Sequence, residues 1–174
     1  LAAVDIGGEP GKMFDMAGKS PAGATIRIVT AMAHKGEMSW FYKLQGDDEL
    51  VTAQKPNFVA FLKSVKVEEP AMPAALPSGH PPIGGGGMSG SGMPGAVTTA
   101  APPAPRTGGP TWTVPTGWQE ISGGQFLFAK FLIAGEGDAK AAVNVSSSAG
   151  DGGGLTANIN RWRAQLGQGP WSEA

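Results

Sequence analysis

The feature that most constrains this chain of 174 residues is a long interruption at residues 68–110. This segment holds ten prolines and ten glycines, and it has no charged side chain between Glu69 and Arg106. Because it can bury little apolar surface, packing would not offset the conformational entropy lost on ordering it. We therefore predict a disordered linker with a root-mean-square span of about 35–40 Å. The flanking segments, 1–67 and 111–174, are each small for an independent core.

Residues 1–67 carry a strand pattern that gives way to a helical one. Residues 11–18 and 24–33 are predicted to be strands, the latter because its apolar side chains alternate with other residues. The sequence at 34–37 predicts a turn, after which residues 38–44 return as the second strand of a hairpin.

A helix is expected after this hairpin. Four large apolar side chains recur at helical spacing on one face: Phe58, Phe61, Leu62 and Val65. Pro56 suits the first turn of such a helix, where its missing N–H costs nothing. The acidic run at 47–49 is better explained by turn formation and the helix dipole than by calcium binding. Residues 64–67 offer a final edge strand.

The second segment has the same order of elements. Residues 112–120 form an extended opening with a Pro-Thr-Gly turn, and residues 125–133 are apolar enough for a buried strand. After a glycine-rich hairpin turn, residues 141–148 alternate as a further strand. A glycine loop at 149–154 leads into a helix whose apolar face and glycine stop are Leu155, Ile159, Trp162, Leu166 and Gly167. The two segments together predict an α+β fold, in which helices flank an antiparallel sheet assembled from both ends of the chain.

Short motifs connect these segments with a known fold. Pro115, Gly117 and Trp118 open the second segment, and the first closes with FVAFLKSVKV at residues 58–67. This pattern resembles the Mog1/PsbP/DcrB-like group of domains. The stretches NRWRAQLG at residues 160–167 and WFYKLQGDD at residues 40–48 together resemble an uncharacterised bacterial exported or lipoprotein-like family on that plan. The resemblance implies an antiparallel sheet with helices on its faces and a periplasmic or cell-envelope location. It implies no particular chemistry.

The two motifs stand in the opposite order from that group, in which the Gly-Trp half comes first. We favour a circularly permuted monomer, because a 43-residue linker gives the tethered halves an effective concentration of about a millimolar. The alternatives are a fragment of a tandem-repeat protein, and a structural subunit whose halves complement those of neighbouring chains in a swapped or polymeric assembly.

Composition argues against several classes of function. The 13 basic and 14 acidic residues are balanced, and no basic stripe carries interleaved aromatic residues, so we do not expect nucleic acid as a partner. No apolar run approaches the roughly 20 residues that a membrane-spanning helix needs. Cysteine is absent, which excludes disulfides, thiol catalysis and cysteine-based zinc sites. The five tryptophans are expected to be core and anchor residues.

The glycine loop at 149–154 is the sharpest local feature. Such a loop before a helix can hold phosphate, but this one lacks the Gly-Lys-Ser/Thr ending and the spaced glycines of nucleotide sites. Asp151 would repel an anion and is better explained as the N-terminal cap of the helix. His34, in the hairpin turn, and His80, in the linker, have no partner nearby in the sequence. We therefore predict no catalytic residue, no metal site and no cofactor.

The candidates for ligand or partner binding lie on the last helix and in the loop before it: Asp151, Asn158, Asn160, Arg161 and Arg163. Two arginines and an asparagine can bind a carboxylate or an acidic partner. The alternatives are a solvated helix face, and an arginine that holds the helix by bonding the carbonyl groups of the glycine loop.

These observations predict a non-catalytic binding or accessory module outside the cytoplasm, whose partner is another protein or a small ligand. The prediction rests on the lack of a catalytic constellation in the sequence and on the family resemblance. Two alternatives remain. One is the structural subunit described above, and the other is an enzyme whose site forms only in the fold, near residues 149–163.

Overall fold

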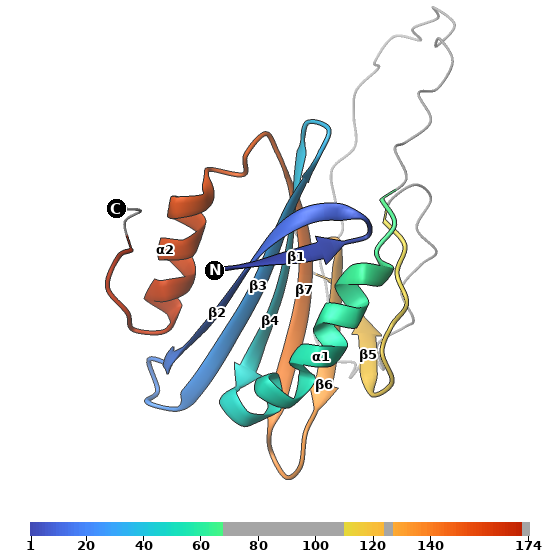
Figure 1. Cartoon of the computed structure of the whole chain (residues 1–174). Coiled ribbons are helices and arrows are strands. Elements are labelled where there is room, and N and C mark those ends of the chain that lie inside the picture. Colours follow the sequence, from blue (N-terminus) through green and yellow to red (C-terminus); the bar gives the residue numbers. More distant parts are fainter. Residues whose placement is uncertain (68–109, 124–126, 172–174) are drawn as a thin grey trace, which may run out of the picture.

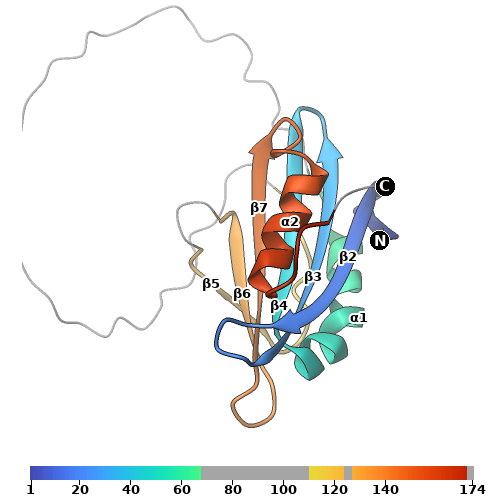
Figure 2. The same cartoon turned by 90° about the vertical axis from the view of Figure 1, so that its left-hand side faces the viewer.

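The computed structural model describes residues 1–67, 110–123 and 127–171. Within these ranges the chain forms one seven-stranded sheet of antiparallel neighbours with a helix against each face (Figure 1). After a quarter turn, one helix lies in front of the sheet and the other behind it (Figure 2). The predicted α+β architecture is confirmed at this level. The predicted linker, 68–110, lies outside the described residues except at Pro110.

The elements follow the chain in this order: β1 (Ala2–Ile6), β2 (Glu9–Lys19), β3 (Thr25–Lys35), β4 (Met38–Asp47), α1 (Asp48–Ser64), β5 (Trp118–Ile121), β6 (Ala129–Ala134), β7 (Lys140–Ala149) and α2 (Leu155–Gln165). In the sheet the order is β1-β2-β3-β4-β7-β6-β5. Strands β4 and β7 pair over nine positions, from Met38↔Ala149 to Gly46↔Ala141. The two halves of the chain therefore close on each other within one sheet.

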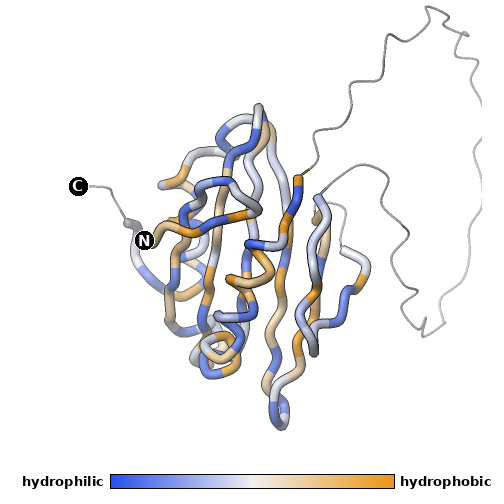
Figure 3. Tube along the Cα trace, turned by 45° about the vertical axis from the view of Figure 1, so that its right-hand side comes forward, coloured by the Kyte–Doolittle hydropathy of each residue, from blue (hydrophilic) through white to orange (hydrophobic). Residues whose placement is uncertain are grey.

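Side chains alternate between the two faces of this sheet. Hydrophobic and hydrophilic residues follow each other closely along the strands in Figure 3. Along β4, the side chains of Trp40, Tyr42 and Leu44 belong to the main core beneath α1. Those of Phe41 and Lys43 point to the opposite face, which α2 covers. One strand thus contributes to both sides of the molecule.

Phe61 of α1 lies at the centre of the main core. Its ring centroid is 5.4–6.3 Å from those of four other aromatic residues, which are Tyr42, Trp112, Trp118 and Phe131. Aromatic pairs at such separations contribute about 0.5–1.5 kcal/mol beyond area burial. Because Tyr42 comes from the first half of the chain and the other three from the second, this cluster holds the halves together.

A smaller core lies under α2. Ile159 and Trp162 pack against Phe14 of β2, and the ring centroids of Phe14 and Trp162 are 6.4 Å apart. All three side chains are buried. The predicted apolar face of this helix is therefore confirmed, and it is directed at β2.

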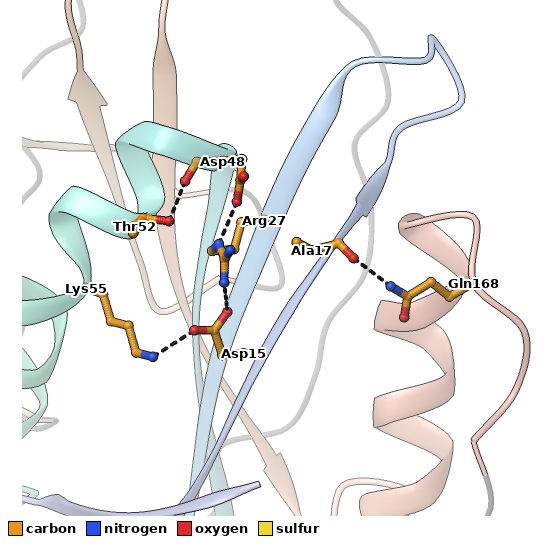
Figure 4. Close-up of polar contacts among 7 residues, drawn as sticks. All are labelled: Asp15, Ala17, Arg27, Asp48, Thr52, Lys55 and Gln168. Carbon is orange, nitrogen blue, oxygen red and sulfur yellow. Dashed lines mark hydrogen bonds and ion pairs between the residues drawn. The ribbon is translucent and has the colours of Figure 1, made fainter.

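Two hydrogen bonds, one between backbone groups and one from a side chain, hold the C-terminal end of α2 against the same strand. The Lys19 N–H donates a hydrogen bond of 3.1 Å to the Leu166 carbonyl. Gln168 Nε2 donates one of 2.6 Å to the Ala17 carbonyl (Figure 4). Gly167 between them has a φ of +65°, which explains why a glycine ends the helix.

Ion pairs join α1 to β2 and β3 (Figure 4). Arg27 donates from Nη1 to Asp15 and from Nε to Asp48, each over 2.6 Å. Lys55 donates to the second oxygen of Asp15 over 2.7 Å. Burial raises the pKa of the Asp15 carboxyl, but the hydrogen bonds and charges of Lys55 and Arg27 outweigh it and hold the pKa below its usual value.

Pro56 lies inside α1 and not in its first turn, so that prediction is wrong. The helix begins at Asp48, and the first turn holds Asp48 and Glu49, as the helix dipole favours. The Thr52 hydroxyl donates to the Asp48 carbonyl over 2.7 Å within this early part of the helix. The proline removes one backbone hydrogen bond from the interior, a cost that the buried face after it offsets.

Two differences concern the edges of the sheet. Residues 64–67 do not form a strand but an isolated bridge between Lys66 and Thr111, because Val65 turns into the core. Strand β1 is not predicted by the pattern, since only Val4 and Ile6 are buried in it. Two buried side chains are too few to distinguish a short strand from a loop.

We expect Asp15→Asn to lower the free energy of unfolding at about pH 7 by roughly 0.5–1 kcal/mol, since the network is partly exposed. A carboxyl whose pKa is lowered in the folded state stabilises the fold above its unfolded pKa, and the contribution is lost as pH falls through the folded pKa. The difference in the free energy of unfolding between wild type and variant, measured by urea denaturation, should therefore become smaller between about pH 5 and pH 2. Asp138→Asn, in the exposed β6–β7 turn, is the control. A difference that does not change with pH would contradict this account.

Candidate functional site

A pocket of about 500 Å³ lies between α2 and the face of the sheet formed by β4 and β7. Its polar lining comes from all three elements and includes Lys43, Asn144, Ser146, Asn158, Arg161 and Gln165. Phe41 and Trp162 close it on the apolar side. The size is within the range of pockets that hold small molecules.

Lys43 stands in the middle of the sheet under this pocket. Cross-strand pairing places it opposite Thr30 of β3 and Asn144 of β7, with all three side chains on the α2 face. Its ammonium donates a hydrogen bond of 2.6 Å to Gln165 Oε1. Burial lowers the pKa of the Lys43 amine to about 8, because desolvation disfavours the charged form.

Three acceptor oxygens in this part of the sheet are buried without a hydrogen-bond partner among the described residues. They are Thr30 Oγ1, Gln45 Oε1 and Asn144 Oδ1. Native structures leave few such groups, because each costs roughly 1–3 kcal/mol of desolvation. Asn144 is also a lining residue of the pocket, although its Oδ1 is itself shielded from solvent.

Asn158 connects the glycine loop to α2. Its side chain is 4% exposed, and Nδ2 donates to the carbonyls of Gly152 and Gly154 over 3.0 and 2.9 Å. Its Oδ1 accepts a longer hydrogen bond, 3.4 Å, from Arg161 Nη1. The loop carbonyls are thus bonded by Asn158, whereas one alternative from the sequence was an arginine in this role. Arg161 is exposed and lines the pocket.

The glycine loop is shaped by its packing on the sheet. Gly152 has a φ of +64°, and a side chain there would collide with the ring of Phe41. Asp151 closes the loop by accepting from the Gly153 N–H over 3.0 Å. The residue at the N-cap position is Gly154, so the prediction that Asp151 caps the helix is wrong. Asp151 stabilises the loop that precedes the helix.

Two further predicted residues support the segment after α2. Asn160 Oδ1 accepts from the Trp171 N–H. Arg163 Nε donates to the Gly169 carbonyl over 2.7 Å. Neither residue lines the pocket. Of the five residues predicted to bind, the structure brings only Asn158 and Arg161 to it.

The sequence does not single out Lys43, Asn144 or Gln165. The first two occupy strand positions that alternate with buried apolar residues, so a pattern-based interpretation assigns them to a solvated face. Their placement under α2 follows from the pairing of β4 with β7. That pairing joins residues about a hundred positions apart in the sequence, such as Lys43 and Asn144. No pattern within either strand predicts it.

The pocket carries positive charge. Lys43 and Arg161 line it, and no carboxylate is found among the described residues of its lining. Neither cation forms an ion pair in the described part of the chain, whereas Lys35 and Lys55 both do. An anion in the pocket would therefore find two uncompensated cations.

A serine and a histidine also meet in the structure, at the far end of the same sheet. Ser39 Oγ lies 2.8 Å from His34 Nδ1 and also donates to the Gly150 carbonyl. Which of the two atoms donates in the contact between Ser39 and His34 depends on the tautomer of the ring. Ser39 is moreover fully buried. The pair fixes the loop to the β3–β4 hairpin.

Over the described ranges, no three His, Cys, Asp or Glu side chains are grouped so as to hold a metal ion. No helix in those ranges is long and apolar enough to cross a membrane. No protein-family model, curated protein or solved structure matches the chain. The site is therefore interpreted from its own chemistry.

We expect Asn158→Ala to lower the free energy of unfolding by about 1–3 kcal/mol, because two loop carbonyls lose their donor. Asn160→Ala, on the same helix, loses a single hydrogen bond at a half-buried position and should cost less. Thermal and urea denaturation of the two variants measure this order. Equal losses would show that Asn158 does not organise the loop.

Proposed function

We propose that the chain is a non-catalytic binding module that holds a small anionic ligand in the pocket between α2 and the β4–β7 face. The observation that carries this proposal is the pair of unpaired cations, Lys43 and Arg161, in a pocket whose described lining has no carboxylate. The amide groups of Asn144, Asn158 and Gln165 supply further hydrogen-bonding atoms around them.

Charge and geometry favour a carboxylate or a phosphate. The planar guanidinium of Arg161 suits two-point bonding to such a group, and its hydrogen bond with Asn158 orients it. Burial disfavours the charged form of Lys43, and an anion beside it would offset that cost. The pocket volume suits a molecule of metabolite size rather than a protein segment.

The finer fold assignment is part of the same proposal. An antiparallel sheet flanked by helices supports a Mog1/PsbP-like plan, as does the position of Pro115, Gly117 and Trp118 at the start of β5. The closing motif fits as well, since α1 ends at Ser64 and Val65 is buried after it. The reversed order of the halves supports a circular permutation of that plan. The extracytoplasmic location rests on the resemblance alone.

Binding is tested by titrating lactate, succinate and inorganic phosphate into ¹⁵N-labelled protein and following amide shifts. We expect shifts at the pocket, and we expect Arg161→Ala to weaken the binding of the best anion about tenfold, the loss of one charged contact. Arg163→Ala is the matched control, because Arg163 lies on the same helix and bonds Gly169 instead. Binding that survives Arg161→Ala unchanged, or no shift at the pocket with any of the three anions, would refute the proposal.

Affinity should also fall with rising pH. The Lys43 amine, with a pKa of about 8, is largely protonated at about pH 7 and largely neutral at about pH 9.5. The other charged groups on that face include Arg161 on α2, Lys12 on β2 and Lys130 on β6, and none of these three is an anion that would neutralise Lys43. Calorimetric titration with phosphate or succinate should therefore show weaker binding at the higher pH, and proton uptake on binding near pH 8. Lys43→Arg should flatten this dependence, and an equally steep profile in that variant would assign it to another group.

A further inference from the structure

We propose that Lys43 forms a reversible imine with the carbonyl group of a small oxo acid bound in this pocket. The ligand class is thereby narrowed to anions that also carry an aldehyde or keto group. The inference rests on the proposed function, because Arg161 must hold the acid group while Lys43 reacts.

The surroundings of Lys43 set it apart from a lysine in an ion pair. It projects from a central strand into the pocket, where its hydrogen-bond acceptor is the neutral amide of Gln165. The charged group on the facing helix is Arg161, four residues before Gln165 and so on the same side of α2. Partial burial of the Lys43 amine favours its neutral form.

The neutral amine is the form that attacks a carbonyl carbon. Because burial lowers its pKa to about 8, roughly a fifth of the Lys43 side chains are neutral at about pH 7.4. An ordinary lysine is neutral in only about one molecule in a thousand at that pH. In the free protein Lys43 is therefore neutral far more often than an ordinary lysine, although a bound acid group shifts it back toward the charged form.

The reaction balances without any further reagent. The lone pair of Lys43 Nζ forms a C–N bond, and the carbonyl π electrons move to oxygen, which takes up a proton to give a carbinolamine. The nitrogen gives up its two protons in turn, the first balancing the proton on the carbinolamine oxygen and the second the proton with which the hydroxyl group leaves as water, so that the C=N bond replaces the C=O bond. No atom is oxidised or reduced, and hydrolysis reverses the step.

The product formed at Lys43 would lie beside the amide oxygen of Asn144, which has no hydrogen-bond donor among the described residues. Asn144 lies directly opposite Lys43 in the β4–β7 pairing, and its Oδ1 is buried without a donor among the described residues. A carbinolamine hydroxyl or an iminium N–H formed at Lys43 would be such a donor once the Asn144 side chain turned toward it, because its Oδ1 is shielded from solvent. The site therefore offers an acceptor that the free amine, bonded to Gln165, does not satisfy.

The test uses glyoxylate as the probe, with cyanoborohydride to reduce any imine to a stable secondary amine. Peptide mapping by mass spectrometry then gives the extent of modification at each lysine. We expect Lys43 to be modified at least about tenfold faster than Lys130, which lies on the same face of the sheet outside the pocket. Arg161→Ala should slow the reaction at Lys43 about tenfold and leave Lys130 unchanged. Acetaldehyde, which lacks the acid group, should show little preference for Lys43.

The outcomes separate this inference from the proposed function. If lactate binds at the pocket but glyoxylate modifies Lys43 no faster than Lys130, the imine is refuted and anion binding stands. If modification of Lys43 is fast but insensitive to Arg161→Ala, the oxo-acid assignment is refuted. If neither lactate nor glyoxylate perturbs the pocket, both proposals fail together. Because the comparison of lysines is made within the wild-type protein, an unstable variant does not prevent a decision.

Discussion

The pairing of β4 with β7 is the interaction on which the rest of this structure depends. It joins strands from opposite sides of a long Pro/Gly-rich segment along nine residue pairs. Once that register is set, Tyr42 and Leu44 meet Val143 and Val145 beneath α1, and the aromatic cluster around Phe61 can draw on both halves. Because side chains alternate in a strand, the same register determines what faces the other way. A slip by one residue would exchange the two faces and lose both cores.

On the α2 face, the same register produces a polar pocket beside a small apolar core. Its apolar contacts are concentrated on β2, around Phe14 and Trp162, while polar side chains follow on β4 and β7. A helix seated over one part of a sheet leaves space over the next strands, and here the space is lined by Lys43, Asn144 and Arg161. The pocket is therefore a consequence of where α2 packs, and its charge is a consequence of which residues alternate with the core.

Much of the fold was accessible from the sequence, because strong local patterns carried it. The alternation in residues 24–33 predicted β3, and the helical spacing of Phe58, Phe61 and Leu62 predicted α1 with its buried face. Short elements and exact helix ends could not be predicted. Strand β1 was not predicted, and the start of α1 was placed wrongly. The candidate site could likewise be predicted only where a local pattern marked its residues. Asn158 and Arg161 were found because they share a helix with a clear polar side, whereas Lys43 became a pocket residue only through a long-range pairing.

The chemistry of Lys43 also explains why a polar row persists in the middle of a sheet. The charge of Lys43 is partly desolvated, and its neighbours Thr30 and Asn144 hold side-chain oxygens without a partner among the described residues. Such a group contributes little to the stability of the fold, and apolar side chains at these positions would contribute more. Local features that work against stability are most often retained where they take part in binding or reaction. The same burial that weakens the fold leaves an uncompensated cation and an unused acceptor side by side. Under the proposed function, one ligand that brings an acid group and a hydrogen-bond donor would remove both deficits, and the stability of the sheet would then depend on the occupancy of the pocket.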